Sequence, residues 1–455
     1  MKGESKMCKV SIIMPSYNVC KYIRECLESI RKQTLDDIEV ICVDAFSTDG
    51  TREIIQEYVD KDSRFIMIND DKGSCGYSYN KGIDKASGEY IGFVETDDYI
   101  AEGMFEVLYT AAEKYRLGYV KSNYTAFCNL DTENRYYEEM GIVSNMPDIY
   151  GKIIAPCDMP ELLVCDQNMW NGIYRSDFIK DNVRLNESKG AAYQDISFLI
   201  QTICQAKRAM YINECMYFYR RDNENASMVN PKGVVNLYRE FMYAKLFMEK
   251  CKNISQYHWC YFYMKLVNSG ILKNSGNLVE LHNGEKPELY DTLENVRKEM
   301  ITADKNGYIS YAILGNERYK HVKELIKSVK EYVAYINADF QNREDVLGKF
   351  LERLKGEKNI VIFGAGNCGK RAFLSLARKE LQDNVAAFCD NDEKKQNTKL
   401  YGKDILSLKT ILDKEKIPFF VVANEKYYMD IVRQLRTACI SETNIILYKI
   451  TGMEW

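Results

Sequence analysis

The sequence is poor in histidine and proline, and it contains no apolar run long enough to cross a lipid bilayer. Its three histidines lie far apart, and none of its 15 cysteines forms a Cys-x-x-Cys pair, which argues against a zinc site of the usual spacing. Seven prolines and the absence of low-complexity sequence restrict the expected disorder to short loops. What remains is a folded protein without a membrane span, and its 455 residues are enough for two or three domains.

An excess of either charge is also missing. The 62 basic and 66 acidic side chains give a net charge of −4 without a long basic run, which argues against a nucleic-acid partner. The first residues are polar and charged rather than secretory, and the odd number of cysteines fits reduced thiols. We therefore expect a cytoplasmic protein, and contact with the inner face of a membrane is left open.

Strand and helix signals alternate between residues 9 and 127. The predicted strands are the apolar runs at 9–14, 38–44, 65–69 and 90–94. Segments with apolar residues at helical spacing separate them, for example Ile23, Leu27 and Ile30. This α/β pattern predicts right-handed crossovers and a parallel sheet with helices on both faces. Since ligands bind at the carboxyl ends of such strands, acidic residues that end two of them should converge.

The regions that follow have different patterns. Short helices and a strand pair at 209–213 and 216–221 are expected up to residue 230. Residues 231–350 carry many aromatic side chains at helical spacing, which predicts a helical domain or connector. Helix packing or formation of a homodimer explains these aromatics better than membrane contact. From 356 to 455 strands and helices alternate again, which predicts a small Rossmann-like α/β domain.

Three acidic features of the first region carry candidate chemistry. They are Asp44 at the end of a strand, the turn Glu95-Thr96-Asp97-Asp98 after another strand, and Asp195 at the start of a helix. Each alone has a plain structural explanation, as a solvated loop acid for Asp44 and as helix caps for the other two. Together they could supply a nucleotide contact, carboxylate ligands for a divalent cation and a general base.

Several segments, in this order, resemble the family 2 glycosyltransferases of the GT-A fold. They are Val10–Asn18, Val43–Thr51, Gly76–Gly82, Ala86–Ile91 with the acidic turn, Trp170–Arg175 and Gln194-Asp195. The resemblance covers about residues 8–230, which we therefore predict to be a catalytic domain. Because the segments occur together in one order, they are far more specific than the acidic turn alone.

The resemblance implies a role for each of the matching residues. The residues that would bind the nucleotide sugar are Pro15, Tyr17, Asp44, Glu95, Thr96 and Asp97. Asp97 would also bind Mn²⁺ or Mg²⁺, and Asp195 would deprotonate the acceptor hydroxyl. Trp170 and Asn171 would lie on the acceptor side, although a buried tryptophan is usually part of a core. The implied reaction is an inverting transfer from a UDP-sugar to a glycan or lipid-linked acceptor in surface polysaccharide synthesis.

The sequence departs from the family pattern at four positions. Ala45 and Phe46 stand where the family usually has Asp and Gly, Glu95 stands where it has Asp, and Tyr79 stands where Arg is common. These departures motivate a second hypothesis, a nucleotide-sugar-binding or assembly subunit with weak or no catalysis.

A glycine-rich loop opens the carboxyl-terminal domain. Gly364, Gly366 and Gly369 follow a predicted strand and begin a helix, and Asp390 ends the next strand. The pattern resembles the nucleotide-binding unit of dehydrogenases and of the amino-terminal domains of some sugar acetyltransferases. It implies a nucleotide or nucleotide sugar at these four residues, and an empty scaffold is equally consistent. An NAD(P)-linked oxidoreductase is the less favoured alternative, because no catalytic Lys, Tyr or His constellation follows.

Overall fold

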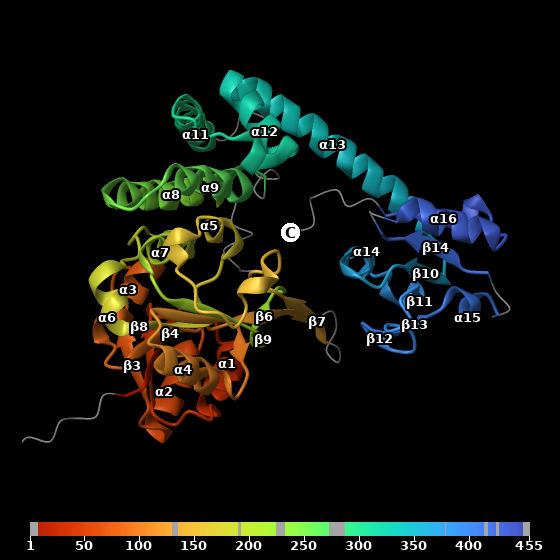
Figure 1. Cartoon of the computed structure of the whole chain (residues 1–455). Coiled ribbons are helices and arrows are strands. Elements are labelled where there is room, and N and C mark those ends of the chain that lie inside the picture. Colours follow the sequence, from red (N-terminus) through yellow and green to blue (C-terminus); the bar gives the residue numbers. More distant parts are fainter. Residues whose placement is uncertain are drawn as a thin grey trace, which may run out of the picture. The chain divides into compact units, whose positions relative to one another are not determined.

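The computed structural model describes residues 8–129, 135–189, 193–223, 233–272, 287–377, 379–413, 417–424 and 427–448. The chain divides into two compact units between Ala334 and Tyr335. Figure 1 shows that each unit has a sheet of its own. Among the described residues, no helix combines the length and the apolar character that crossing a bilayer requires.

The described part of the first unit contains a nine-stranded mixed sheet with the order β3-β2-β1-β4-β8-β6-β9-β5, in which β7 also pairs with β6. The strands are β1 (Val10–Ser16), β2 (Ile38–Asp44), β3 (Phe65–Asn69), β4 (Tyr90–Phe93), β5 (Tyr99–Ile100), β6 (Tyr119–Asn129), β7 (Arg135–Met140), β8 (Gly172–Arg175) and β9 (Ala209–Arg220). The strands β3, β2, β1 and β4 are parallel, as the sequence predicts.

Helices cover both faces of this sheet. They are α1 (Ile23–Arg31), α2 (Thr51–Lys61), α3 (Cys75–Lys85), α4 (Met104–Tyr115), α5 (Leu162–Cys165), α6 (Ser176–Asn182) and α7 (Gln194–Gln205). In Figure 1, α1, α2 and α4 lie on one face and α3, α6 and α7 on the other. Coverage on both sides explains why β1 is apolar almost throughout, with Val10, Ile12 and Ile13 fully buried.

Close packing of α3 on β1 depends on a glycine. A Cβ atom on Gly82 would lie 2.4 Å from Cγ2 of Ile13, so a larger residue would push the helix away from the strand. Because β3, β2, β1 and β4 pair in parallel, their carboxyl ends form one row, in the order Asn69, Asp44, Ser16 and Phe93. Asp44 is one of these strand ends, and the acidic turn from Glu95 to Asp98 follows β4.

The predicted strand pair at 209–213 and 216–221 is wrong. The chain forms one long strand, β9, which runs parallel to β6. The register changes from the pair Ser122–Ile212 to the pair Asn123–Cys215, so Asn213 and Glu214 form a bulge rather than a turn. The polar residues that suggested a hairpin mark this bulge.

The helical region up to Ala334 belongs to the first unit. Its helices are α8 (Gly233–Lys250), α9 (Gln256–Leu266), the π-helix η4 (Val267–Leu272), α11 (Pro287–Lys305), α12 (Tyr311–Lys327) and the start of α13 (Val329–Leu354). On α9, the Lys265 ammonium group donates to the backbone oxygen of Asp166 at 3.2 Å. Several of the aromatic side chains pack on one another, with ring centroids 5.3 Å apart for Phe241 and Phe262 and 5.6 Å for Trp259 and Tyr308.

The second unit has a sheet with the order β12-β13-β11-β10-β14-β15. Its elements are β10 (Ile360–Phe363), α14 (Asn367–Ala377), β11 (Val385–Cys389), β12 (Lys399–Leu400), β13 (Lys403–Leu406), α15 (Leu408–Leu412), β14 (Phe419–Val422), α16 (Tyr428–Thr437) and β15 (Ile445–Leu447). All neighbours are parallel except β12 and β13. If β12 is left out and β10, β11, β13, β14 and β15 are numbered 1 to 5, their order in the sheet is 3-2-1-4-5. This is the order of doubly wound sheets, in which ligands bind beside the first strand.

Candidate active site

The acidic turn after β4 brings three carboxyl groups together. Ligand atoms of Glu95, Asp97 and Asp98 all lie within 4.8 Å of one another. Asp98 is buried, and its two oxygens accept hydrogen bonds from the Tyr217 hydroxyl at 2.9 Å and the Arg220 amide at 2.7 Å. Asp98 therefore holds the turn in place. The half-buried Glu95 and Asp97 are better placed to bind a cation.

Burial and crowding act on the acids of this turn. Burial, together with the negative charges of Asp97 and Asp195, raises the pKa of Glu95 to about 8. Burial also raises the pKa of Asp98 well above its usual value, again with help from its acidic neighbours. A divalent cation would relieve this repulsion, and carboxylate oxygens are ligands that Mg²⁺ and Mn²⁺ accept. The turn has the donor set for such an ion.

Asp195 lies close enough to this turn for its charge to act on Glu95. It is half-buried in the first turn of α7, and the preceding Tyr193 has a left-handed backbone with φ of 68°. The acidic turn does not cap α4, whereas Asp195 accepts a hydrogen bond from the Ile196 amide at 2.9 Å within the first turn of α7. The N-cap residues of α4 and α7 are Gly103 and Tyr193, and neither makes a side-chain capping hydrogen bond.

Asp44 is fully buried, so it is not a solvated loop acid. Its carboxylate accepts hydrogen bonds from the Ser16 hydroxyl at 3.0 Å and the Ser47 hydroxyl at 2.6 Å, and it pairs with Arg52 at 2.7 Å. Asp44 therefore shapes the loop after β2 from within. The side chain that projects from this loop is Phe46, of which 53% is exposed.

The end of β1 connects this loop with the acidic turn. The Thr96 hydroxyl donates to the backbone oxygen of Pro15 at 3.2 Å, which fixes the turn against β1. Tyr17, two residues later, is 64% exposed. The predicted donor-binding residues thus lie along one edge of the sheet. Of the two predicted at the end of β1, Pro15 is half-buried and Tyr17 presents a largely exposed side chain.

Trp170 and Asn171 lie in the core. The indole of Trp170 stacks on Tyr217 with centroids 4.1 Å apart and on Tyr219 at 5.3 Å, and 5% of the residue is exposed. Asn171 is fully buried, and its side-chain amide donates to the backbone oxygen of Ser122 at 2.6 Å. Trp170 is therefore part of the core, and it does not form an open surface for an acceptor.

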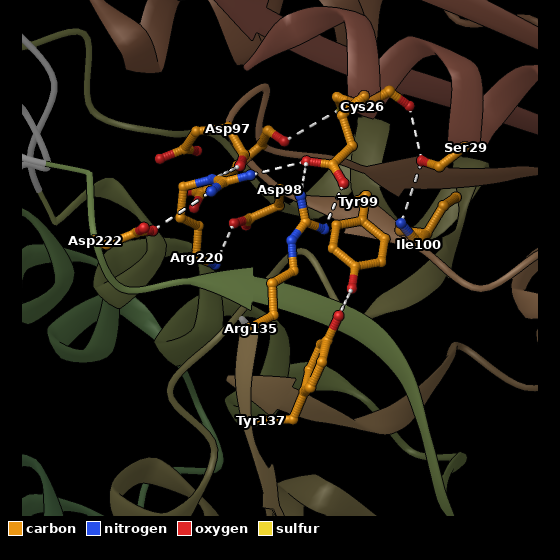
Figure 2. A network of polar contacts seen from close by, with 12 residues as sticks. Cys26, Ser29, Asp97, Asp98, Tyr99, Ile100, Arg135, Tyr137, Arg220 and Asp222 are labelled. Atoms are coloured by element: carbon orange, nitrogen blue, oxygen red, sulfur yellow. Dashed lines mark hydrogen bonds and ion pairs between the residues drawn. The ribbon is translucent and has the colours of Figure 1, made fainter. Parts of the chain in front are cut away.

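Arg220 at the end of β9 is a residue whose role the sequence does not indicate. Its guanidinium group donates to the backbone oxygen of Asp97 at 2.8 Å and to Glu25 at 2.9 Å. Figure 2 shows Arg220 directly beside Asp97, Asp98 and Asp222. Only 4% of Arg220 is exposed. Arg220 is therefore a buried cation that holds the acidic turn in place.

We expect Arg220→Ala to lower the free energy of unfolding by about 1–3 kcal/mol, because the Asp97 carbonyl loses its buried donor. Glu25 keeps its second pair, with Arg135 at 2.6 Å. Urea denaturation monitored by circular dichroism measures this change. Arg24→Ala is the matched control, since Arg24 forms an exposed pair with Glu57 at 3.0 Å and its loss should barely change the midpoint. Equal losses in both variants would contradict a supporting role for Arg220.

Glu240 on α8 is a second residue that the sequence does not single out. It is fully buried and accepts hydrogen bonds from Asn186 and Ser188 at 3.0 Å and from Ser197 at 3.2 Å. Burial raises its pKa to about 7. Since Ser197 lies two residues after Asp195, Glu240 ties the helical region to the start of α7.

The glycine loop of the second unit is a tight turn between β10 and α14. Gly364 has φ of 116°, and a Cβ on Gly369 would lie 1.7 Å from the Gly364 oxygen, whereas a Cβ on Gly366 would meet nothing within 4 Å. The Asp390 carboxylate accepts from the Ala365 amide at 2.7 Å and pairs with Lys395 at 3.2 Å. Asp390 thus braces the loop, and the space beside Gly366 is open.

Comparison with known proteins matches both units to families. The family model described as glycosyl transferase family 2 matches residues 11–179, and the one described as C2185-like, N-terminal, matches residues 356–446. The uncharacterized glycosyltransferase EpsJ of Bacillus subtilis is 30% identical over 241 residues, which are 51% of this chain and 67% of that protein. The chain belongs to glycosyltransferase family 2. The predicted family is therefore confirmed, and the chain is a glycosyltransferase.

Two further proteins support the assignment of this chain to the glycosyltransferases. GlyG of Streptococcus pneumoniae, also named a glycosyltransferase, is 29% identical over 224 residues, which are 47% of this chain and 70% of that protein. The crystal structure of S. aureus TarS 1–349 in complex with UDP-GlcNAc has a TM-score of 0.58 at 18% identity, and the match covers 73% of this chain and 92% of that one. This likeness confirms the predicted GT-A fold.

Proposed function

We propose that this glycosyltransferase moves a sugar from a UDP-sugar to a hydroxyl group of a glycan or lipid-linked acceptor, with inversion at the anomeric carbon. The observation that carries the proposal is the convergence of Asp97 and Asp195 on Glu95, whose pKa both of their charges raise although Asp195 comes from a segment 100 residues further along the chain. A carboxylate pair for the diphosphate side and a third carboxylate for the acceptor side are the groups that such a transfer needs.

The row of strand ends supports a nucleotide that lies across the sheet edge. The loops after β1 and β2 would hold the base and ribose, and the turn after β4 would face the diphosphate. Since β4 and β2 are two strand spacings apart, the two positions are separated by about 10 Å, which a nucleoside diphosphate can span. Uridine is proposed because a protein of the same fold, TarS, has been crystallised with UDP-GlcNAc.

The chemistry follows from the placement of the acids. Glu95 and Asp97 would hold Mn²⁺ or Mg²⁺, which when bound neutralises charge on the leaving diphosphate. Asp195 accepts the proton of the acceptor hydroxyl. The hydroxyl oxygen attacks the anomeric carbon from the side opposite the diphosphate, and the bond from that carbon to the diphosphate oxygen breaks. A single displacement of this kind inverts the configuration.

Surface polysaccharide synthesis on the cytoplasmic side of a membrane is the proposed setting, and Trp170 and Asn171 would support the acceptor side from within the core. The second unit would add a nucleotide or nucleotide-sugar site at Gly364, Gly366 and Gly369, with Asp390 bracing the loop. Its open space beside Gly366 at the first strand of a doubly wound sheet supports this part of the proposal.

A donor screen tests the proposed function. Release of nucleotide diphosphate is measured for UDP-, GDP-, CDP- and ADP-sugars with Mn²⁺, and again after chelation with EDTA, over a panel of glycan and lipid-linked acceptors. We expect release from a UDP-sugar and its loss on chelation. UDP binding without transfer to any acceptor would favour the second hypothesis of a binding or assembly subunit, which the departures at Ala45, Tyr79 and Glu95 motivate.

A further inference from the structure

Phe46 adopts a conformation that is unfavourable for a phenylalanine. Its backbone φ is 56°, in the left-handed region that bulky residues rarely occupy. In addition, 53% of the residue is exposed to solvent. A glycine at this position would relieve the backbone strain and remove the exposed apolar ring. Folding therefore does not explain the phenylalanine, and strained residues of this kind are concentrated at functional sites.

The ring of Phe46 is held from one side. The Arg52 guanidinium carbon lies over the ring, 5.5 Å from its centroid. Arg52 is itself fixed by its ion pair with Asp44 at 2.7 Å and by a hydrogen bond to the Asn69 side chain at 3.0 Å. One face of the Phe46 ring thus contacts the Arg52 guanidinium group, which is held by side chains at the ends of β2 and β3.

The backbone around Phe46 is fixed as well. The Ala45 amide donates to the Ser16 oxygen at 2.9 Å, and the Asn18 amide donates to the Ser47 hydroxyl at 2.9 Å. These bonds join the loop after β2 to the loop after β1, which carries the exposed Tyr17. An exposed ring with a fixed backbone and one supported face is a preorganised stacking surface rather than a mobile surface residue.

We propose that the Phe46 ring stacks on the base of the donor nucleotide, with Arg52 behind it. This inference rests on the proposed function, because it places the base over the loop after β2 while the acidic turn after β4 faces the diphosphate. Stacking on an aromatic ring tolerates every base, since each has a π face. Phe46 therefore contributes affinity for the nucleoside and little choice among bases.

The test compares Phe46→Gly and Phe46→Trp with the unaltered protein. Isothermal calorimetry with Mn²⁺ measures binding of UDP and of inorganic pyrophosphate, which has no base. Because loss of one base–aromatic stack weakens binding about 5- to 150-fold, we expect a loss in this range for UDP in Phe46→Gly and recovery in Phe46→Trp. Pyrophosphate binding should be unchanged. Tyr257→Ala, which removes a 64% exposed aromatic residue of α9, is the control and should bind UDP normally.

The thermal midpoint without ligand completes the test. Phe46→Gly should keep or raise the midpoint, because the strain and the exposed ring are removed. A clearly lower midpoint would show that the ring stabilises the fold and would overturn the inference, as would unchanged UDP binding. If the unaltered protein binds none of UDP, GDP, CDP and ADP, the proposed function fails instead. The two failures are therefore distinguishable.

Discussion

Asp97→Asn is expected to reduce sugar transfer by at least about 1000-fold, since the loss of several kcal/mol of charge stabilisation costs tenfold in rate per 1.4 kcal/mol. Asparagine has the shape of aspartate and can still accept the 2.8 Å hydrogen bond from the Asn223 side chain. The substitution therefore removes the charge and leaves the position of the turn unchanged. Nucleotide release with a UDP-sugar and Mn²⁺ measures the effect.

Although Asp97→Asn should lose transfer activity, its thermal stability should not fall. The charge of Asp97 is one of the causes that raise the pKa of Glu95 to about 8, so its removal relieves repulsion within the turn. We expect the thermal midpoint without metal to stay equal or rise, and the stabilisation by Mn²⁺ to disappear. Asp177→Asn, whose side chain is 65% exposed in its pair with Arg175, is the control and should keep both properties. Full transfer by Asp97→Asn would refute the metal role.

Asp195→Asn is expected to lower kcat by about 10²- to 10⁴-fold, the usual contribution of a positioned general base. Asparagine cannot take up the proton of the acceptor hydroxyl, but it keeps the size of the side chain at the start of α7. Binding of UDP with Mn²⁺ should remain, because Glu95 and Asp97 are intact. Steady-state rates and calorimetry on the same preparation separate these two quantities.

The two variants differ in a way that tests the roles against each other. Asp97→Asn should lose metal-assisted UDP binding, whereas Asp195→Asn should lose only the transfer step. If Asp195→Asn loses UDP binding as severely as Asp97→Asn does, Asp195 belongs to the donor site and another group is the base. An unchanged rate in Asp195→Asn would remove the general-base assignment altogether.

Much of the fold and the acidic site could be predicted because the relevant signals are local. Strands buried on both faces are continuously apolar, as β1 is, and their helices show apolar residues three and four positions apart, as α1 does. The meeting of strand ends is then a consequence of parallel pairing. The proximity of Asp195 to Glu95 needed the family resemblance as well, since no local pattern connects α7 with β4.

The residues that the sequence did not reveal act through contacts between distant parts of the chain. Arg220 reaches back to Glu25, 195 positions away, and no spacing rule relates the two. The bulge in β9 depends on the register that β6 imposes. The burial of Asp44 depends on Arg52 and on Ser16 of the neighbouring strand. At each of these three places the local sequence is rich in turn-forming and polar residues. From the sequence alone, an exposed loop would be an equally good interpretation.

Glu240 has a practical consequence for anyone who expresses pieces of this chain. A fragment that ends at residue 230 contains every acid of the proposed reaction, but it lacks the carboxyl group to which Asn186, Ser188 and Ser197 donate. Those three side chains would then have to find water, and the first turn of α7 would lose its anchor to α8. A fragment meant to keep this anchor must therefore extend at least through α8, which ends at Lys250, well beyond the segment that matches the family model.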